Sequence, residues 1–380
     1  MRVLHIAGGF AMHPLYDQLV RHLRELNLQQ TIFAPVRSAA EERRQPSDER
    51  PELEYKFRNI LNPAHRVFFR YKITKIYSEL LKSIDPYQLN LAHAHTTYSD
   101  GAVALRLHRQ FGIPFVVAVR NTDLNIFMRF RPDLRNQLHS VVREASRVVF
   151  LSPAYRSEFL SQLTESLRAM VQKKAVVLGN GIDAFWLENY PIQERDTSKP
   201  LGVLYVGDFS RNKNVESILR ATAVVAKRMP VRLTLVGGGG SRDRHVRELI
   251  DKGQYPFTKF VGRVNDRYRL REIYREHDVF VMPSFKESFG VVYLEALSQG
   301  LPIVHSHGQG VDGFFAPHTV AEATNPHKIA SIAASIESLA ARRDRVRPIC
   351  HHEAKKFSWD TIAFRYVGLY NSSSSGNATT

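Results

Sequence analysis

The chain has 380 residues, enough for two α/β domains of ordinary size, and 43% of the residues are hydrophobic. Its formal net charge of +16 favours negatively charged partners. Such a partner could be a nucleotide phosphate, a phosphorylated acceptor, anionic lipid or nucleic acid, and the charge alone does not choose among them. The single cysteine, Cys350, excludes an intramolecular disulfide, and no apolar run approaches the roughly 18 to 20 residues that a membrane span needs.

Short apolar runs alternate with helical patterns along the chain, which predicts parallel sheets covered by helices on both faces. We expect strands at 3–7, 30–34, 89–94, 115–119, 148–151 and 175–178, and a second series at 201–206, 232–236, 259–261, 279–282 and 302–305. A polar stretch with two prolines and no periodicity predicts an interdomain linker at 187–200. The predicted fold class is therefore α/β, with two doubly wound, Rossmann-like domains, 1–186 and 201–355, facing across a cleft.

Glycines end several of the expected strands. Gly8 and Gly9 follow the first strand, and Gly237 follows a strand of the second domain. Without a Cβ atom, such residues let backbone amides approach a phosphate or a sugar, although flexible turn glycines are an alternative reading. No G-x-G-x-x-G pattern opens the first helix, which argues against a dinucleotide-binding domain.

A basic, aromatic segment spans residues 55–82, with seven Lys or Arg against one acid, Glu79. Part of it has the spacing of a helix with one apolar face. A basic amphipathic helix favours an anionic membrane surface or a lipid-linked diphosphate acceptor, but a core-facing helix with a solvated basic side fits equally well. The residues that would contact acceptor or membrane are Arg66, Arg70, Lys72 and Lys75. No nucleic acid is expected, because no recognised binding module accompanies the charge.

Histidines alternate at two expected strand ends, as His93 and His95 and as His305 and His307. Cysteine partners and a third convergent ligand are not apparent in the sequence. We therefore expect ordinary hydrogen-bonded histidines there, and no metal.

The segment PSFKESFGVVYLEALSQGLPIV, residues 283–304, carries the most information about function. It predicts a strand end, a Gly-containing junction and a helix closed by Gly300. Backbone amides at the helix start would face an anion, with the positive end of the helix dipole behind them; these are the amides of Ser288, Phe289, Gly290 and Val291. Glu287 precedes the helix, and Glu295 lies roughly one turn inside it, where its carboxylate can accept from a vicinal diol. This pattern predicts a nucleotide-sugar pocket.

The same segment resembles the signature of retaining glycosyltransferases of the GT-B fold, in particular family 4: Glu, any residue, Phe-Gly, then Glu-Ala and Gly-x-Pro. The resemblance implies that Glu287 contacts the donor sugar and is needed for catalysis, and that Glu295 binds the ribose. A segment at 178–186 and a helix at 356–371, expected to return to the first domain, extend the likeness along nearly the whole chain. Residues 372–380 are expected to form a disordered tail.

Two of the departures from the family pattern involve charged residues. Lys213 matches the Lys that holds the donor diphosphate, but Asp208 stands where the family has Arg, and Arg211 is our candidate for the missing charge. Where the family has a His that contacts the donor sugar, this chain has Arg120, while Asp123 is kept. The resemblance makes Arg120 and Asp123 candidates for the catalytic site. Gly262 and Val264 are expected beside the base.

We therefore expect a retaining, metal-independent hexosyltransferase that uses a UDP- or GDP-linked sugar and no cofactor. Its acceptor would be a saccharide or lipid-linked hydroxyl in bacterial cell-surface polysaccharide or lipopolysaccharide synthesis. The expected location is the cytoplasm, with peripheral attachment to the inner face of the plasma membrane. A non-catalytic, basic scaffold of the same fold that binds membrane or RNA is the alternative, and a sugar phosphorylase would need a longer chain and a pyridoxal phosphate lysine.

Overall fold

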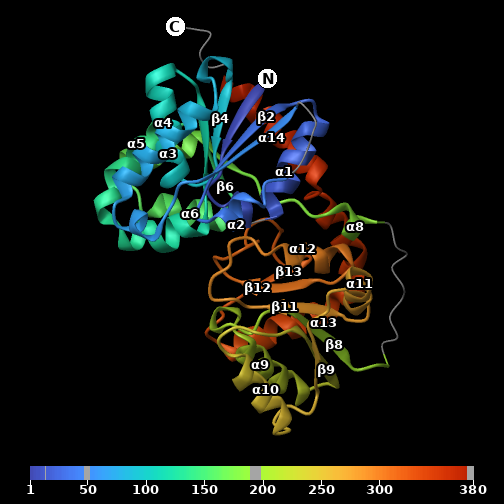
Figure 1. Cartoon of the computed structure of the whole chain (residues 1–380). Helices are drawn as coiled ribbons and strands as arrows, with labels where there is room; N and C mark the ends of the chain where they lie inside the picture. Colours follow the sequence, from blue (N-terminus) through green and yellow to red (C-terminus); the bar gives the residue numbers. More distant parts are fainter. Residues whose placement is uncertain (13, 47–51, 189–197, 375–380) are drawn as a thin grey trace. The chain divides into compact units, whose positions relative to one another are not determined.

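The computed structural model describes residues 1–12, 14–46, 52–188 and 198–374 (Figure 1). These residues form two compact units. The N-terminal unit comprises Met1–Leu151, Arg156–Gly181 and the segment from Trp359 onward, and the C-terminal unit comprises Ser152–Tyr155 and Ile182–Ser358. The middle of the predicted linker, residues 189–197, and the end of the predicted tail, 375–380, lie outside the described residues.

The N-terminal unit is built on a seven-stranded sheet in the order β3-β2-β1-β4-β5-β6-β7. Its neighbouring strands pair in parallel. The strands are β1 (Arg2–Ile6), β2 (Gln29–Val36), β3 (Leu53–Asn59), β4 (Leu91–Ala94), β5 (Phe115–Val119), β6 (Arg147–Phe150) and β7 (Ala175–Val177). The strand β3 was not predicted, whereas the other six lie where the sequence places them to within two or three residues.

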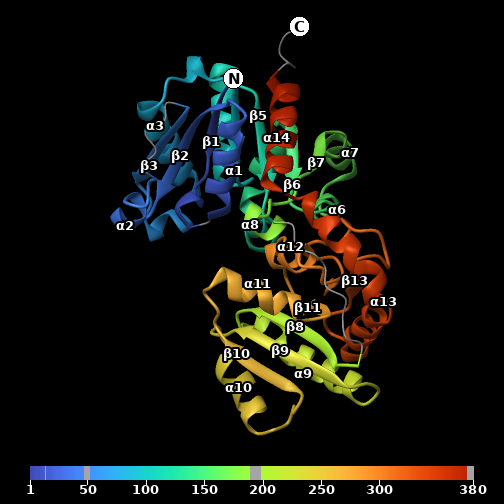
Figure 2. The same ribbon diagram turned by 90° about the vertical axis from the view of Figure 1, so that its right-hand side faces the viewer.

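Helices cover both faces of this sheet, as expected for a doubly wound domain. They are α1 (Pro14–Glu25), α2 (Ala39–Glu42), α3 (Phe69–Ser83), α4 (Ser99–Phe111), α5 (Arg135–Glu144), α6 (Pro153–Ser161), α7 (Glu165–Lys174) and α14 (Trp359–Ser374). Helices α1 and α14 pack side by side on one face (Figure 2). Their apolar residues share a buried cluster with Val3, Leu91 and Val116 of the sheet. The last helix thus packs on the first unit, and it extends three residues beyond the predicted end at 371.

The C-terminal unit contains a parallel sheet of six strands in the order β10-β9-β8-β11-β12-β13. These strands are β8 (Leu201–Gly207), β9 (Val231–Gly237), β10 (Thr258–Gly262), β11 (Val279–Met282), β12 (Ile303–Ser306) and β13 (Ala321–Thr324). Its helices are α8 (Ala184–Leu187), α9 (Val215–Ala226), α10 (Asp243–Asp251), α11 (Arg267–Arg275), α12 (Val291–Ser298) and α13 (Ile329–Lys355). One large apolar core joins sheet and helices. The short edge strand β13 was not predicted.

The strand order reverses between β8 and β11, which are neighbours in the sheet but far apart in the sequence. At such a switch point the loops after the two strands diverge and leave a crevice at the carboxyl edge of the sheet. The fold class predicted from the sequence, two doubly wound α/β domains, is confirmed.

Candidate functional site

The loops after β8 and β11 carry the residues that the sequence singled out. The first loop contains the short 3-10 turn Arg211–Lys213 and leads into α9, and the second contains Glu287 and leads into α12. Because both loops leave the carboxyl edge of the sheet at the switch point, they face each other within the C-terminal unit.

Lys213 and Glu287 form an ion pair across these loops. The Lys213 Nζ lies 2.6 Å from Glu287 Oε2, with side-chain exposures of 21% and 11%. Solvent screens a partly buried ion pair less than a surface pair. Removal of one partner leaves the other charge unpaired where water can hydrate it only in part. The structure thus brings the expected phosphate-binding lysine and the expected catalytic carboxylate together.

Asn212 joins the two loops through its side-chain amide. Its Nδ2 donates to the carbonyl of Lys286 at 2.8 Å, and its Oδ1 accepts from the Lys286 amide at 3.0 Å. The Phe285 amide donates to the Asn212 carbonyl at 2.8 Å. Asn212 therefore fixes the position of Lys213 relative to Glu287, a role that sequence reasoning missed.

A third loop, after β12, supports Glu287 from the other side. The Glu287 amide donates to Gln309 Oε1 at 3.1 Å, and the Gly310 amide donates to the Glu287 carbonyl at 2.9 Å. A Cβ atom on Gly310, which has a φ of 55°, would lie 3.1 Å from Glu287 Cγ. Sequence reasoning did not find these two residues, although the GQG run was a visible turn signal.

Glu295 lies on α12, and its side chain is half-buried beside the core. Tyr274, which is fully buried, donates its hydroxyl to Glu295 Oε2 at 3.1 Å. Burial raises the pKa of Glu295 to about 7, while the Tyr274 hydrogen bond and the charge of Arg267 oppose this rise. The carboxylate is therefore poised between its protonated and ionised forms near neutral pH.

The loop after β10 leads to the start of α11, where Arg267 is close enough for its positive charge to lower the pKa of Glu295. Gly262 ends β10 with a φ of 81° and with nothing within 4 Å of the place of a Cβ atom. Val264 packs partly against the core. Gly262 and Val264 thus lie at the carboxyl end of β10, on the side of the sheet from which the loop leads to α11 and Glu295; their roles beside a base and a ribose stay a prediction.

The helix start before α12 differs in part from the prediction. Gly290 caps the helix in the left-handed region, with a φ of 80°, and a Cβ atom there would meet the Tyr293 ring at 2.6 Å. The Ser288 amide donates to Glu287 Oε1 at 3.1 Å, so it is already used by the carboxylate beside it. The Phe289 side chain is buried against Phe314, so only its backbone can face a ligand. Val291 begins the helix and is partly buried.

The structure does not place Arg211 beside Lys213 and Glu287. Arg211 lines a pocket of about 190 Å³ at the start of α9, together with Glu216, Arg220 and Arg242. Asp208, where the family has Arg, accepts from the Ser210 amide at 2.7 Å and so shapes the turn after β8. Among the described residues, Lys213 is thus the cation that pairs with Glu287, and the assignment of Arg211 to the donor diphosphate stays a prediction.

Gly237 allows the ends of β8 and β9 to approach closely. Its φ is 122°, and a Cβ atom there would lie 1.9 Å from the Gly207 carbonyl oxygen. The neighbouring amide of Gly238 donates to that oxygen at 3.2 Å. Gly237 therefore shapes the sheet edge from which the Lys213 loop departs.

In the N-terminal unit, Asp123 is fully buried. Its carboxylate accepts from the amides of Thr97, Tyr98 and Arg120, the last at 2.8 Å, and from the Thr97 hydroxyl. Burial raises its pKa to about 6, while these hydrogen bonds oppose the rise. This placement differs from the prediction of a catalytic residue, because a carboxylate enclosed by backbone amides positions the segments before α4 and after β5 and has no open side for a substrate.

Arg120 extends from the end of β5 toward Tyr16 and His95. Its Nε donates to the His95 carbonyl at 3.2 Å, and its guanidinium lies 5.5 Å from the centre of the Tyr16 ring. Gly8 and Gly9 follow β1, and the Gly8 amide donates to Asp100 Oδ1 at 3.3 Å. That amide is thus engaged by a side chain of α4, so the expectation that it faces a phosphate or sugar does not describe this structure.

The two units were compared with known proteins. The family model described as "Glycosyltransferase Family 4" matches residues 15–184, and the model described as "Glycosyl transferases group 1" matches residues 200–342. Together they cover both units. The chain belongs to the GT-B glycosyltransferases of family 4.

Individual relatives of this glycosyltransferase agree with that assignment. An uncharacterized glycosyltransferase, MJ1607, of Methanocaldococcus jannaschii is 24% identical, with 96% of this chain and 94% of the relative covered. The putative teichuronic acid biosynthesis glycosyltransferase TuaC of Bacillus subtilis is also 24% identical, with 84% of each chain covered. Among solved structures, Anabaena Alr3699/HepE in complex with UDP has a TM-score of 0.71 and 16% identity, covering 98% of this chain and all of that one (100%), and shows the shared GT-B fold.

The basic segment of the glycosyltransferase divides between strand β3, turn Pro63–Arg66 and helix α3. The apolar face of α3 is buried, as the core-facing alternative predicted, through Phe69, Ile73, Ile76 and Leu80. Lys72 also turns inward, because its Nζ donates to Ser99 Oγ at 2.7 Å and burial lowers its pKa to about 8. This corrects its assignment to a membrane-facing surface. Arg70 is exposed, and Lys75 is half-buried.

Large apolar side chains remain exposed at the start of α3. They are Val67, Phe68 and Tyr71, with exposures of 74%, 64% and 63%. The segment after β5 packs on the same end of α3, since the Phe127 and Phe69 rings lie 5.6 Å apart, and it exposes Phe130. No helix among the described residues is long and apolar enough to cross a membrane.

Proposed function

We propose that this glycosyltransferase moves a sugar from a UDP- or GDP-linked donor to an acceptor hydroxyl with retention of the anomeric configuration. The observation that carries the proposal is the Lys213–Glu287 pair at the carboxyl edge of the C-terminal sheet. Glu295 on the following helix adds a carboxylate suited to two vicinal hydroxyls. A cation paired with one carboxylate, and a second carboxylate on the helix that follows, match a ligand with a diphosphate between two sugars.

In the proposed reaction, the bond between the anomeric carbon and the diphosphate oxygen breaks while the acceptor oxygen bonds that carbon on the same face. The acceptor proton passes to the departing phosphate. Lys213 stabilises the negative charge that develops on that phosphate, and Glu287 orients the sugar hydroxyls and stabilises the positive charge on the ring. Glu295 holds the ribose, and Gly262 and Val264 flank the base. Arg120 has no assigned step.

We propose that the donor phosphates are held without a metal ion or other cofactor. The sequence contains no Asp-x-Asp pair, the arrangement with which many metal-dependent transferases hold a divalent ion on the diphosphate. Lys213 and the amides at the start of α12 supply the positive potential instead. The carboxylate of Asp208, which is exposed near the same turn, reduces that positive potential. Lys213 therefore provides most of the electrostatic stabilisation of the diphosphate in this proposal.

The acceptor that we propose is a saccharide or lipid-linked hydroxyl in bacterial cell-surface polysaccharide or lipopolysaccharide synthesis, with the enzyme held peripherally at the inner face of the plasma membrane. Support comes from the likeness to TuaC, whose name assigns it to teichuronic acid biosynthesis. Exposed aromatic side chains beside Arg70 at the start of α3 suit a membrane interface.

The test is the rate of donor hydrolysis and transfer with a panel of UDP- and GDP-linked hexoses. We expect Glu287→Gln to lower the rate at least about 100-fold, because charge stabilisation in an active site contributes several kcal/mol. The control is Glu248→Gln, which removes an exposed carboxylate of α10 and should leave the rate unchanged. Proton NMR of the product should show the donor's anomeric configuration, and EDTA should not lower the rate.

An unchanged rate in Glu287→Gln would remove this residue from the mechanism. Calorimetry decides between the proposal and the alternative of a non-catalytic scaffold, because a scaffold would bind none of the donors. An inverted product would contradict retention, and a rate abolished by EDTA and restored by Mg²⁺ would contradict metal independence.

A further inference from the structure

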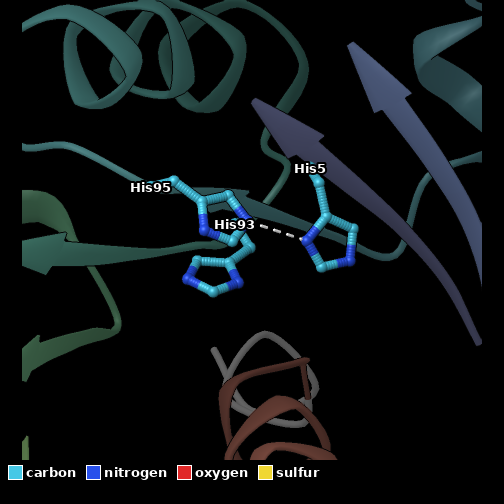
Figure 3. Close-up of side chains that lie close together, drawn as sticks. All are labelled: His5, His93 and His95. Carbon is cyan, nitrogen blue, oxygen red and sulfur yellow. Dashed lines mark hydrogen bonds between the residues drawn. The ribbon is translucent and has the colours of Figure 1, made fainter. Parts of the chain in front are cut away.

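Three histidines meet in the interior of the N-terminal unit (Figure 3). His5 lies on β1, His93 lies on β4, and His95 directly follows β4. Because His5 and His93 are register partners on neighbouring strands, and His93 and His95 are two residues apart, all three side chains lie on the same face of the sheet. This is the face that α1 and α14 cover. The three side chains are fully buried.

The rings are close enough to share one ligand. His5 Nδ1 and His95 Nε2 lie 3.0 Å apart, and the His93 and His95 rings stack with centres 4.0 Å apart. One nitrogen from each ring can be chosen so that all three lie within 4.8 Å of one another. His5 is the third convergent group that the sequence could not reveal, because it is 88 positions before His93.

Hydrogen bonding within the described residues does not satisfy this cluster. His5 Nε2, His93 Nε2 and His95 Nδ1 are buried without a hydrogen-bond partner, and so is Gln30 Oε1. The His5–His95 contact uses one N–H and one lone pair, so the second N–H of this pair falls either on His5 Nε2, beside the Gln30 side chain, or on His95 Nδ1, which has no partner. A buried polar group without a partner is destabilising, and several in one place call for a compensating partner.

We propose that His5, His93 and His95 bind a transition-metal ion of the zinc type inside the N-terminal unit. Imidazole nitrogens are preferred ligands of such ions, at about 2.0–2.1 Å for zinc. All three rings are fully buried, which favours their neutral form, the form that binds metals. This site lies on a different unit from Lys213 and Glu287, and it is independent of the proposed donor chemistry.

Two side chains suit the second layer of such a site. Tyr370 of α14 lies 2.7 Å from His93 Nδ1, so its hydroxyl oxygen can accept from that nitrogen while Nε2 turns to the metal. Gln30 acts on His5 and offers an unpaired carbonyl oxygen to the His5 ring. Metal-bound histidines usually donate their other N–H to such a partner, which fixes the tautomer. The ion would therefore link β1 to β4 directly, and α14 to both strands through the hydrogen bond between Tyr370 and His93.

Binding requires a small contraction of the cluster. Tetrahedral ligands at about 2.05 Å from zinc are roughly 3.3 Å apart. The nitrogens lie up to 4.8 Å apart, so side-chain movements that shorten the longest separation by about 1.5 Å are required. Arg120 opposes binding, because its positive charge acts on both His93 and His95. Since the rings are fully buried, the ion must enter during folding or when α14 opens locally.

The test uses the full chain without a polyhistidine tag, produced in zinc-supplemented medium and analysed for metal by plasma mass spectrometry. We expect about one zinc ion per chain, with a zinc-edge X-ray absorption spectrum that fits imidazole nitrogens at about 2.0–2.1 Å. His93→Gln should lose the ion. The control is His352→Gln, which removes an exposed histidine of α13 and should retain it.

Tyr370→Phe keeps the buried ring and all three ligands, so it tests the site even where a histidine variant fails to fold. We expect its zinc affinity, measured by competition with a chromophoric chelator, to fall about 10- to 100-fold. Arg120→Gln should bind zinc more tightly, because it removes a repelling charge. A folded wild-type chain without stoichiometric zinc, or a His93→Gln chain that retains it, would overturn the proposal and leave the cluster as hydrogen-bonded histidines.

Discussion

Lys213 and Glu287 neutralise each other in the structure, and this pairing constrains the proposed reaction. A diphosphate that binds between the loops competes with Glu287 for the Lys213 ammonium group, 2.6 Å away. When Lys213 turns to the phosphate, the Glu287 carboxylate becomes available to the sugar hydroxyls. Because the Glu287 backbone is held by Gln309 and Gly310, the carboxylate can change partner without movement of its loop.

Glu295 gives the site a pH dependence. Its pKa in the folded protein is raised from 4.5 to about 7. Ionised Glu295 therefore does not destabilise the folded state below pH 4.5. The destabilisation grows up to about pH 7 and is constant above it, on the order of 3 kcal/mol. Glu295→Gln removes this penalty. We expect the variant to unfold at a higher temperature than wild type at pH 8 and at a similar temperature at pH 5, in thermal denaturation followed by circular dichroism.

The matched control for this prediction is Glu272→Gln on α11, whose carboxylate is exposed and pairs with Arg275. This control variant should change the midpoint temperature of unfolding only slightly, and by the same amount at pH 5 and at pH 8. In the wild type, donor affinity should fall as the pH drops below 7, because a protonated Glu295 accepts more weakly from the ribose hydroxyls. A difference between Glu295→Gln and wild type that is the same at pH 5 and pH 8 would contradict the assigned cause.

At the level of elements, the sequence predicts strands where apolar residues run without interruption. Both faces of β5 and β11 are buried, and these strands lie where they were expected. In β3, buried Leu53, Tyr55 and Phe57 alternate with charged residues, so the strand was read as part of a basic segment. The loop after β12 was missed for another reason: Gln309 and Gly310 act through backbone contacts with Glu287, which no spacing along the chain reveals.

Gly181 allows the start of helix α14 to pack closely against the N-terminal unit. A Cβ atom on Gly181 would lie 2.2 Å from the Trp359 ring, which is buried at the start of α14. We expect Gly181→Ala to lower the free energy of unfolding by about 1–3 kcal/mol, because it forces the indole out of its packing. Thermal denaturation measures the change.

Gly368, on α14 itself, provides the control. Nothing lies within 4 Å of the place of its Cβ atom, so Gly368→Ala should stabilise the protein by about 0.5–1 kcal/mol through helix propensity. Equal midpoints for Gly181→Ala and wild type would mean that the Trp359 packing adapts, and α14 would then be positioned by its other contacts.

At the scale of the whole chain, alternation of strands and helices was sufficient to predict two doubly wound sheets. It was not sufficient to predict which distant side chains meet. His5 and His93 become neighbours only because β1 pairs with β4, and Asp123 becomes enclosed because the segment before α4 folds over it. Such contacts follow from strand order, whereas the residues of one continuous segment, such as Glu287 and Glu295, could be assigned together before the structure was seen.

The net charge of +16 and the exposed aromatic residues at the start of α3 lead to a prediction for the chain as a whole. We expect the protein to sediment with vesicles that contain anionic lipid, and less so at high salt, because salt screens the attraction of basic groups to the surface. Replacing Phe68 and Tyr71 together by Ser should weaken binding at least about tenfold at constant charge, since each buried aromatic side chain contributes about 1.5–3 kcal/mol.

Tyr87→Ser is the control, because Tyr87 is 85% exposed on another part of the same unit and its replacement should leave vesicle binding unchanged. If binding depends on salt alone and the double variant binds like wild type, the attraction is a general effect of charge, and the start of α3 is not the membrane-facing surface.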